Sequence, residues 1–155
     1  YLARSSTGRV RKGGCYMLPH LEEALRSLRV AARDIKAFQV LKEAPEIDLT
    51  SMCFHVQQAI EKSLKAILFL RQVEFRRTHD LVELAQLLHQ HGVGVPVADD
   101  QLSRLSPFAV ALRYDDMSVS TISREAAAEL VILMYRWAEA LVQAAAGMPD
   151  APHND

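Results

Sequence analysis

The most informative segment of the chain is Phe54-His55-Val56-Gln57-Gln58-Ala59-Ile60-Glu61-Lys62-Ser63-Leu64-Lys65-Ala66. At about 100° per residue, as in an α-helix, one apolar stripe consists of Val56, Ile60, Leu64 and Ile67. A second stripe, whose small side chains permit close approach of a neighbouring helix, consists of Ala59, Ser63, Ala66 and Leu70. A helix with two packed stripes is typical of a bundle. We expect it to extend from about residue 49 to residue 72.

The remaining side of this helix is polar. An arc of about 80° carries His55, Gln58, Lys62 and Lys65. Two lysines one turn apart offer positive charges to an anion such as a nucleotide phosphate, and a histidine adds a hydrogen-bond donor or acceptor. The same pattern is also typical of a solvated or dimer-facing surface, on which Glu61 partly offsets the two lysines.

Helical periodicity recurs on both sides of this segment. We expect helices at about 19–43, 81–91 and 124–143, with a short broken helix starting near residue 99 and interrupted at Pro107. Asp48 or Thr50 is the expected cap of the second helix, and Ser123 that of the last. Since no segment shows a sustained period of two, the sequence predicts an all-α, up-and-down helical bundle.

The corner before the third helix carries a second candidate site. Arg76, Arg77 and His79 stand beside an expected helix N-terminus, whose amide groups favour anions. In the alternative interpretation this is a structural corner, in which Thr78 caps the helix and Asp80 complements its dipole.

Length and composition limit the class of protein. The 155 residues suit a single domain, and no apolar run reaches the length of a membrane span. Cys15 and Cys53 form neither a metal-ligand pattern nor a disulfide framework, which favours a reduced, cytoplasmic setting. We expect no metal and no other cofactor. His89 and His91 are two residues apart and would point in different directions on a helix, so we do not expect them to bind one metal ion together.

The ends of the chain differ from its centre. Residues 1–16 carry four basic side chains and no acid. They form a basic arm that either touches nucleic-acid phosphates or lies upstream of a natural start near Met17. Residues 17–143 are the expected helical bundle, and residues 144–155 are expected to be a flexible tail.

Three motifs in order resemble one family. The run 54–66, the run Arg77-Thr78-His79-Asp80-Leu81, and Arg113-Tyr114 followed by acidic residues are similar to landmarks of the HEPN domain (higher eukaryotes and prokaryotes nucleotide-binding). The resemblance implies a bundle of about five helices, often a homodimer. It also implies a frequent partner, a minimal nucleotidyltransferase of the toxin–antitoxin type. Arg113 and Tyr114 would then line a cleft opposite the second helix or form a salt-bridged corner.

Many HEPN proteins are metal-independent ribonucleases that use an arginine and a histidine separated by four to six residues. The histidine serves as general acid or base, and the arginine holds the scissile phosphate. No histidine of this chain has an arginine at that spacing before it. The strict ribonuclease motif is therefore absent.

These observations favour a nucleotide- or partner-binding module that acts with a nucleotidyltransferase. One alternative is a ribonuclease with a displaced site built from His79, His55 and Arg77, acting on RNA. A second alternative is a structural oligomerisation domain.

Overall fold

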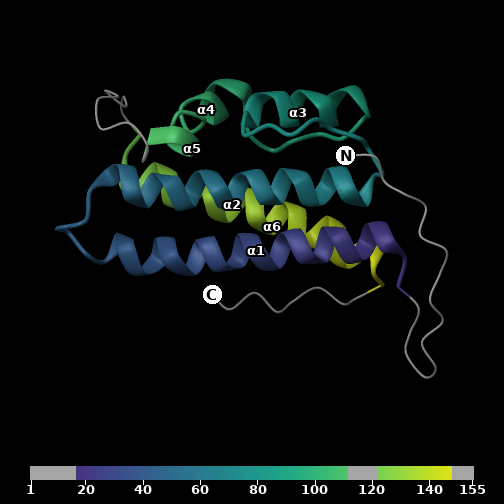
Figure 1. Cartoon of the computed structure of the whole chain (residues 1–155), viewed down its shortest axis with the longest axis horizontal. Coiled ribbons are helices and arrows are strands. Elements are labelled where there is room, and N and C mark those ends of the chain that lie inside the picture. Colours follow the sequence, from purple (N-terminus) through teal and green to yellow (C-terminus); the bar gives the residue numbers. More distant parts are fainter. Residues whose placement is uncertain (1–16, 112–121, 148–155) are drawn as a thin grey trace.

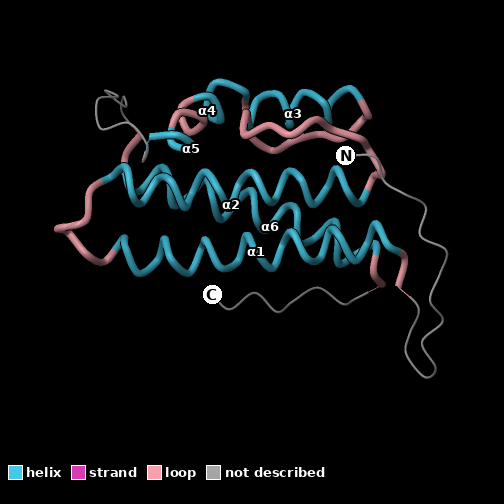
Figure 2. The backbone as a smooth tube through the Cα atoms, in the orientation of Figure 1, coloured by secondary structure: helices cyan, strands magenta, loops and turns pink. Residues whose placement is uncertain are grey.

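The fold is an all-α bundle organised around one central helix. The computed structural model describes residues 17–111 and 122–147. The elements in these ranges are α1 (Pro19–Lys42), α2 (Leu49–Leu70), α3 (Leu81–Gln90), α4 (Asp99–Ser103), α5 (Phe108–Ala111) and α6 (Arg124–Ala145). This part of the chain contains no strand (Figure 2), so the predicted all-α class is confirmed. Residues 1–16, Arg113, Tyr114 and the chain from residue 148 onward lie outside the described residues.

The helix α2 touches most of the other helices. Figure 1 shows α1 and α2 antiparallel to each other, with α6 crossing behind them and α3 to α5 on the opposite side of α2 from α1. Helices α1, α3, α5 and α6 all contact α2. This arrangement explains why the sequence of α2 carries two packed stripes, because it has neighbours on more than one side.

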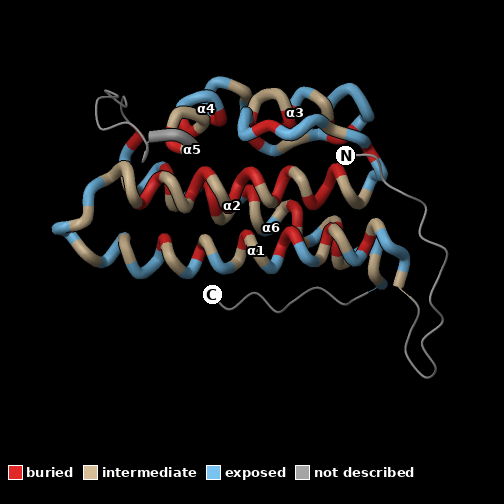
Figure 3. The backbone as a smooth tube through the Cα atoms, viewed as in Figure 1, coloured by how far each residue is buried: buried red, intermediate tan, exposed pale blue. Residues whose placement is uncertain are grey.

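The core follows the predicted stripes of α2. Ile60, Leu64 and Ile67 are fully buried, and each contributes about 1.5–3 kcal/mol of transfer free energy to folding. The small-residue stripe is also largely buried, with Ala59 and Ala66 fully so. Figure 3 shows burial concentrated along α2 and on the facing sides of α1 and α6. The outer sides of the bundle are left to solvent.

Helix ends agree with the sequence in most places. The Asp48 side chain accepts a hydrogen bond from Ser51 N at 2.7 Å, and Ser123 accepts one from Ala126 N at 3.0 Å, so both are N-caps. Helix α2 ends at Leu70, before the predicted residue 72, because Gln72 adopts a left-handed backbone with φ 56°. Helix α6 extends to Ala145, two residues beyond the expected end of the bundle at residue 143.

One apolar position of α6 is not in the core. Leu133 is 47% exposed, whereas the adjacent Met134 is fully buried. Residues spaced three or four apart spread over a wide arc of a helix. Only part of that arc of α6 packs against α1 and α2. Leu133 lies at its solvent edge.

Candidate functional site

A buried carboxylate organises the polar side of α2. Glu61 is fully buried, and its oxygens accept hydrogen bonds from Lys65 Nζ at 2.7 Å and from Gln57 Nε2 at 3.1 Å. Lys62 Nζ lies 3.4 Å from the same carboxylate. We call Gln57, Glu61, Lys62, Lys65 and His79 the Glu61 cluster. Because a buried charge is costly unless it is paired, these contacts are what allow Glu61 to remain ionised.

His79 joins this cluster from the segment before α3. Its Nδ1 lies 3.0 Å from Glu61 Oε2, and its backbone oxygen accepts a hydrogen bond from Gln57 Nε2 at 3.2 Å. A carboxylate only accepts, so Nδ1 carries the proton and Nε2 is the lone-pair nitrogen when the ring is neutral. The side chain is 61% exposed. The arrangement therefore holds an oriented imidazole at the surface on a buried carboxylate.

The electrostatics of Glu61 follow from its surroundings. Burial by itself raises the pKa of Glu61, but the hydrogen bond from Lys65, the charges of Lys62 and Lys65, and the hydrogen bond from Gln57 outweigh it. The pKa of Glu61 therefore lies below its ordinary value, and the group is ionised at neutral pH. With two lysines and one carboxylate, the cluster carries one net positive charge, or two when His79 is protonated.

Local helix geometry produces this arrangement. Gln57, Glu61 and Lys65 follow one another at four-residue intervals, which places their side chains side by side along one edge of α2. The segment 73–80 folds back over that edge before α3 begins and covers Gln57 and Glu61. The same contact leaves Lys62 and Lys65 partly exposed, with side-chain exposures of 25% and 15%.

The predicted stripe is therefore divided. Gln58 stays with the cluster, since its amide donates to Gln57 Oε1 at 2.6 Å and its oxygen lies 3.5 Å from Lys62 Nζ. His55 does not join it. Its Nδ1 lies 3.0 Å from Asp34 Oδ1 on α1, which makes it part of the α1–α2 contact.

The corner before α3 is built differently from the prediction. Asp80, and not Thr78, is the N-cap: its Oδ1 accepts from Val82 N at 3.0 Å and from Glu83 N at 3.2 Å. Thr78 Oγ1 instead accepts from Asp80 N at 3.1 Å. The prediction of Thr78 as the cap was wrong because Thr78 and Asp80 are both good caps, and only the start of α3 at Leu81 selects between them.

These caps also use the amide groups that the sequence offered to an anion. Leu81 N donates to Ser106 Oγ at 3.3 Å, in addition to the two amides that Asp80 accepts. Arg76, whose side chain is 74% exposed, forms an ion pair with Glu83 at 2.6 Å through Nη2. Arg77 is exposed to solvent. Lys62 and Lys65, in contrast, contact the same Glu61 carboxylate as His79.

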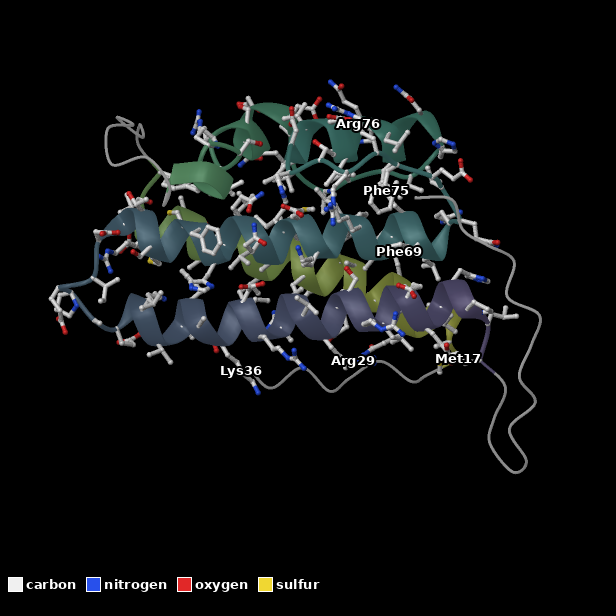
Figure 4. The ribbon with its side chains drawn as sticks, viewed as in Figure 1. Met17, Arg29, Lys36, Phe69, Phe75 and Arg76 are labelled. Atoms are coloured by element: carbon white, nitrogen blue, oxygen red, sulfur yellow. The ribbon has the colours of Figure 1, made fainter. Side chains whose placement is uncertain are left out.

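An aromatic pair borders the cluster. Phe69 and Phe75 contact each other edge to face, with ring centroids 5.4 Å apart. Lys65 Nζ lies 5.9 Å from the centre of the Phe75 ring, so Lys65 connects the aromatic pair to Glu61. Figure 4 shows Phe69 and Phe75 between α2 and the segment ahead of α3, with Arg76 farther out.

Two residues of this site were not predicted. Gln57 and Glu61 are the buried centre of the cluster, whereas the sequence suggested only that Glu61 offsets lysine charge. The signal was the spacing of Gln57, Glu61 and Lys65 along one helix edge, but nothing in the sequence showed that the edge is covered. Within residues 17–111 and 122–147, no three His, Cys, Asp or Glu side chains form a potential metal site. None of the helices described is long and apolar enough to cross a membrane.

The fold and the Glu61 cluster define a helical-bundle protein with a positively charged surface on its central helix, to which the segment before α3 adds a histidine. The family model of the HEPN domain matches residues 24–143, and the chain belongs to that family. Neither the curated proteins nor the solved structures gave a significant match. HEPN domains often dimerise and bind nucleotides or RNA.

Proposed function

We propose that this HEPN domain is a nucleotide-binding regulatory module whose ligand phosphate is held by Lys62, Lys65 and His79. The observation that carries the proposal is the buried carboxylate of Glu61, which gathers these three side chains at one surface. The cluster retains net positive charge after Glu61 is counted. A lysine ammonium is a suitable partner for a phosphate oxygen, and Nε2 of His79 donates a further hydrogen bond to it when the imidazole is protonated.

The aromatic pair supports a nucleotide over a simple anion. Phe75 is partly exposed and is in cation–π contact with Lys65. An apolar ring beside a phosphate-binding lysine offers a surface for a base or sugar, as mixed apolar and polar ligand sites generally do. The arrangement thus provides for both parts of a nucleotide.

The partner in this proposal is a minimal nucleotidyltransferase of the toxin–antitoxin type, and the domain acts as a homodimer. The support for both is the likeness of the three motifs to HEPN domains and the family membership itself. We extend the nucleotide site to Arg113 and Tyr114 on the same likeness.

Calorimetric titration with ATP, ADP and AMP tests the binding. Lys62→Gln is the informative variant, because its contacts with Glu61 and Gln58 are long, at 3.4 and 3.5 Å, and its loss leaves the buried pair of Glu61 and Lys65 intact. We expect about tenfold weaker binding for Lys62→Gln, which corresponds to about 1.4 kcal/mol. Lys42→Gln, on the exposed last turn of α1, is the matched control. Absence of heat with all three nucleotides refutes the proposal.

Co-purification tests the partner. The product of the neighbouring gene is expressed with the chain, and we expect the two proteins to elute together as one complex. Separate elution of two folded proteins contradicts the partnership without bearing on nucleotide binding.

A metal-independent ribonuclease is the second candidate, and His79 is the specific observation in its favour. A histidine oriented through Nδ1 by a carboxylate presents Nε2 as a general base or acid, and the lysines can stabilise charge on a phosphate. The assay is cleavage of RNA in the presence of EDTA. Equal cleavage by the wild type and His79→Ala, or no cleavage by either, excludes this candidate.

A further inference from the structure

A row of positive side chains follows the solvent side of α1. Arg26, Arg29, Arg33 and Lys36 are all exposed, and their spacing of three, four and three residues places them in one arc of the helix. The opposite side of α1 is packed, with Leu28, Ala31 and Ile35 among its buried residues. We call the four exposed residues the α1 basic row.

Few carboxylates neutralise this row. Arg26 forms an ion pair with Glu23 at 2.6 Å. Asp34 is the one acid between Arg26 and Lys36, and it points to His55 on α2. Within the described part of the chain, Arg29, Arg33 and Lys36 take part in no ion pair. The row therefore presents concentrated positive charge to solvent.

The row is separate from the Glu61 cluster. Figure 4 shows Arg29 and Lys36 on the side of α1 that faces away from α2, whereas Phe75 and Arg76 lie beyond the other side of α2. A ligand of the α1 basic row is consequently not the ligand proposed for Lys62, Lys65 and His79.

A shallow hollow adjoins one end of the row. Its volume is about 300 Å³, and it is lined by Met17, Glu22, Leu25, Arg26 and Arg29. Two of these side chains are apolar, two are cationic, and the fifth is the carboxylate of Glu22. Apolar surface beside arginines suits a planar base that is attached to a phosphate, since the base can contact the apolar side chains or stack on a guanidinium plane.

The dimensions fit a short length of nucleic acid. From residue 26 to residue 36 an α-helix rises about 15 Å, which corresponds to four or five steps of about 3.4 Å along one strand. Residues 1–16, which precede Met17 in the sequence, contain four more basic residues and no acid.

We propose that the α1 basic row binds the sugar–phosphate backbone of a single-stranded nucleic acid, with an unpaired base in the hollow beside Met17 and Leu25. The phosphates contact Arg29, Arg33 and Lys36. The single strand is specified by the hollow, because a base within a duplex is stacked and paired and does not reach it.

The test is fluorescence anisotropy with labelled single-stranded RNA and DNA of about a dozen nucleotides, which spans the row with some excess. The variant is Arg29→Gln/Arg33→Gln/Lys36→Gln in the full chain. The control, Lys42→Gln/Arg104→Gln/Arg136→Gln, removes the same charge from three exposed positions outside the row. Circular dichroism establishes that each variant is folded.

We expect the row variant to bind at least about tenfold more weakly at low salt, while the control keeps most of the affinity. Each phosphate contact on a single strand contributes about 0.7 to the slope of log K against log salt, so losing three contacts flattens the slope by about 2. Equal losses in the row variant and the control overturn the proposal. Tighter binding of a duplex of the same length overturns the assignment to a single strand.

Discussion

Replacement of Lys65 by methionine tests the Glu61 cluster most directly. Methionine keeps most of the apolar stem and removes the ammonium group that donates to Glu61 at 2.7 Å. Lys62→Met is the matched control, because it is the same substitution on the same helix, beside the same carboxylate, but its Nζ lies at 3.4 Å. The side chains differ little in exposure, at 15% for Lys65 and 25% for Lys62.

The expected cost follows from the burial of Glu61. Removing one partner of a buried ion pair costs about 3–5 kcal/mol, since the remaining charge stays buried. Glu61 keeps contacts with Gln57 and His79, so we expect the lower end of that range, about 3 kcal/mol, for Lys65→Met. For Lys62→Met we expect about 1 kcal/mol or less, because its contact exceeds the usual hydrogen-bond length.

Urea unfolding at neutral pH measures both changes. With a slope of about 2 kcal/mol/M, a loss of 3 kcal/mol lowers the midpoint by about 1.5 M. Adding Glu61→Gln to Lys65→Met should recover most of this loss, because a neutral amide no longer carries an unpaired buried charge. Equal midpoints for Lys65→Met and Lys62→Met would refute the assignment of Lys65 as the main partner of Glu61, as would a double variant no more stable than Lys65→Met.

Three further predictions concern single groups. The pKa of Glu61 is below its ordinary value of 4.5 in the folded protein. The ionised carboxylate therefore stabilises the fold above about pH 4.5, and this stabilisation is lost as pH falls through the folded pKa. Acid unfolding of Glu61→Gln should consequently depend less steeply on pH than acid unfolding of the wild type. Asp80→Ala should lower the free energy of unfolding, measured with urea, by about 1 kcal/mol because it removes the α3 cap. The control Asp100→Ala, at an exposed position, should have a free energy of unfolding within about 0.5 kcal/mol of the wild type. Burial raises the pKa of the Cys53 thiol to about 11. In a Cys15→Ser background, a thiol reagent at pH 8 should therefore label Cys53 slowly until urea unfolds the chain. Rapid labelling of the folded protein would contradict this burial.

Much of the fold is readable from periodicity and capping. Helix α2 begins at Leu49 as predicted, with Asp48 as its cap, because local hydrogen bonding and the apolar repeat favour the same boundary. The failures have local causes as well. Thr78 and Asp80 are both suitable caps for α3, and only one of them takes that position. Gln72 ends α2 with a left-handed backbone angle that glutamine rarely adopts, so its residue type does not predict it.

The site is less readable because its members come from separate segments. The sequence indicates His55, Gln58, Lys62 and Lys65 as one stripe, since helical spacing alone defines a stripe. Which of them meet depends on the neighbours of α2. His55 pairs with Asp34 of α1, and the segment before α3 brings His79 into contact with Glu61.

The helical class and the polar side of α2 are readable from the sequence because they depend on residues three or four positions apart, and the HEPN resemblance because it depends on three short motifs. That Glu61 is the buried centre of that side follows from the tertiary structure. The local sequence around a glutamate on a helix does not show whether another segment covers it, and in this protein Glu61 is covered. The fold-back of residues 73–80 brings His79 against Glu61, which is fully buried, and a buried carboxylate needs partners such as Lys65 and His79.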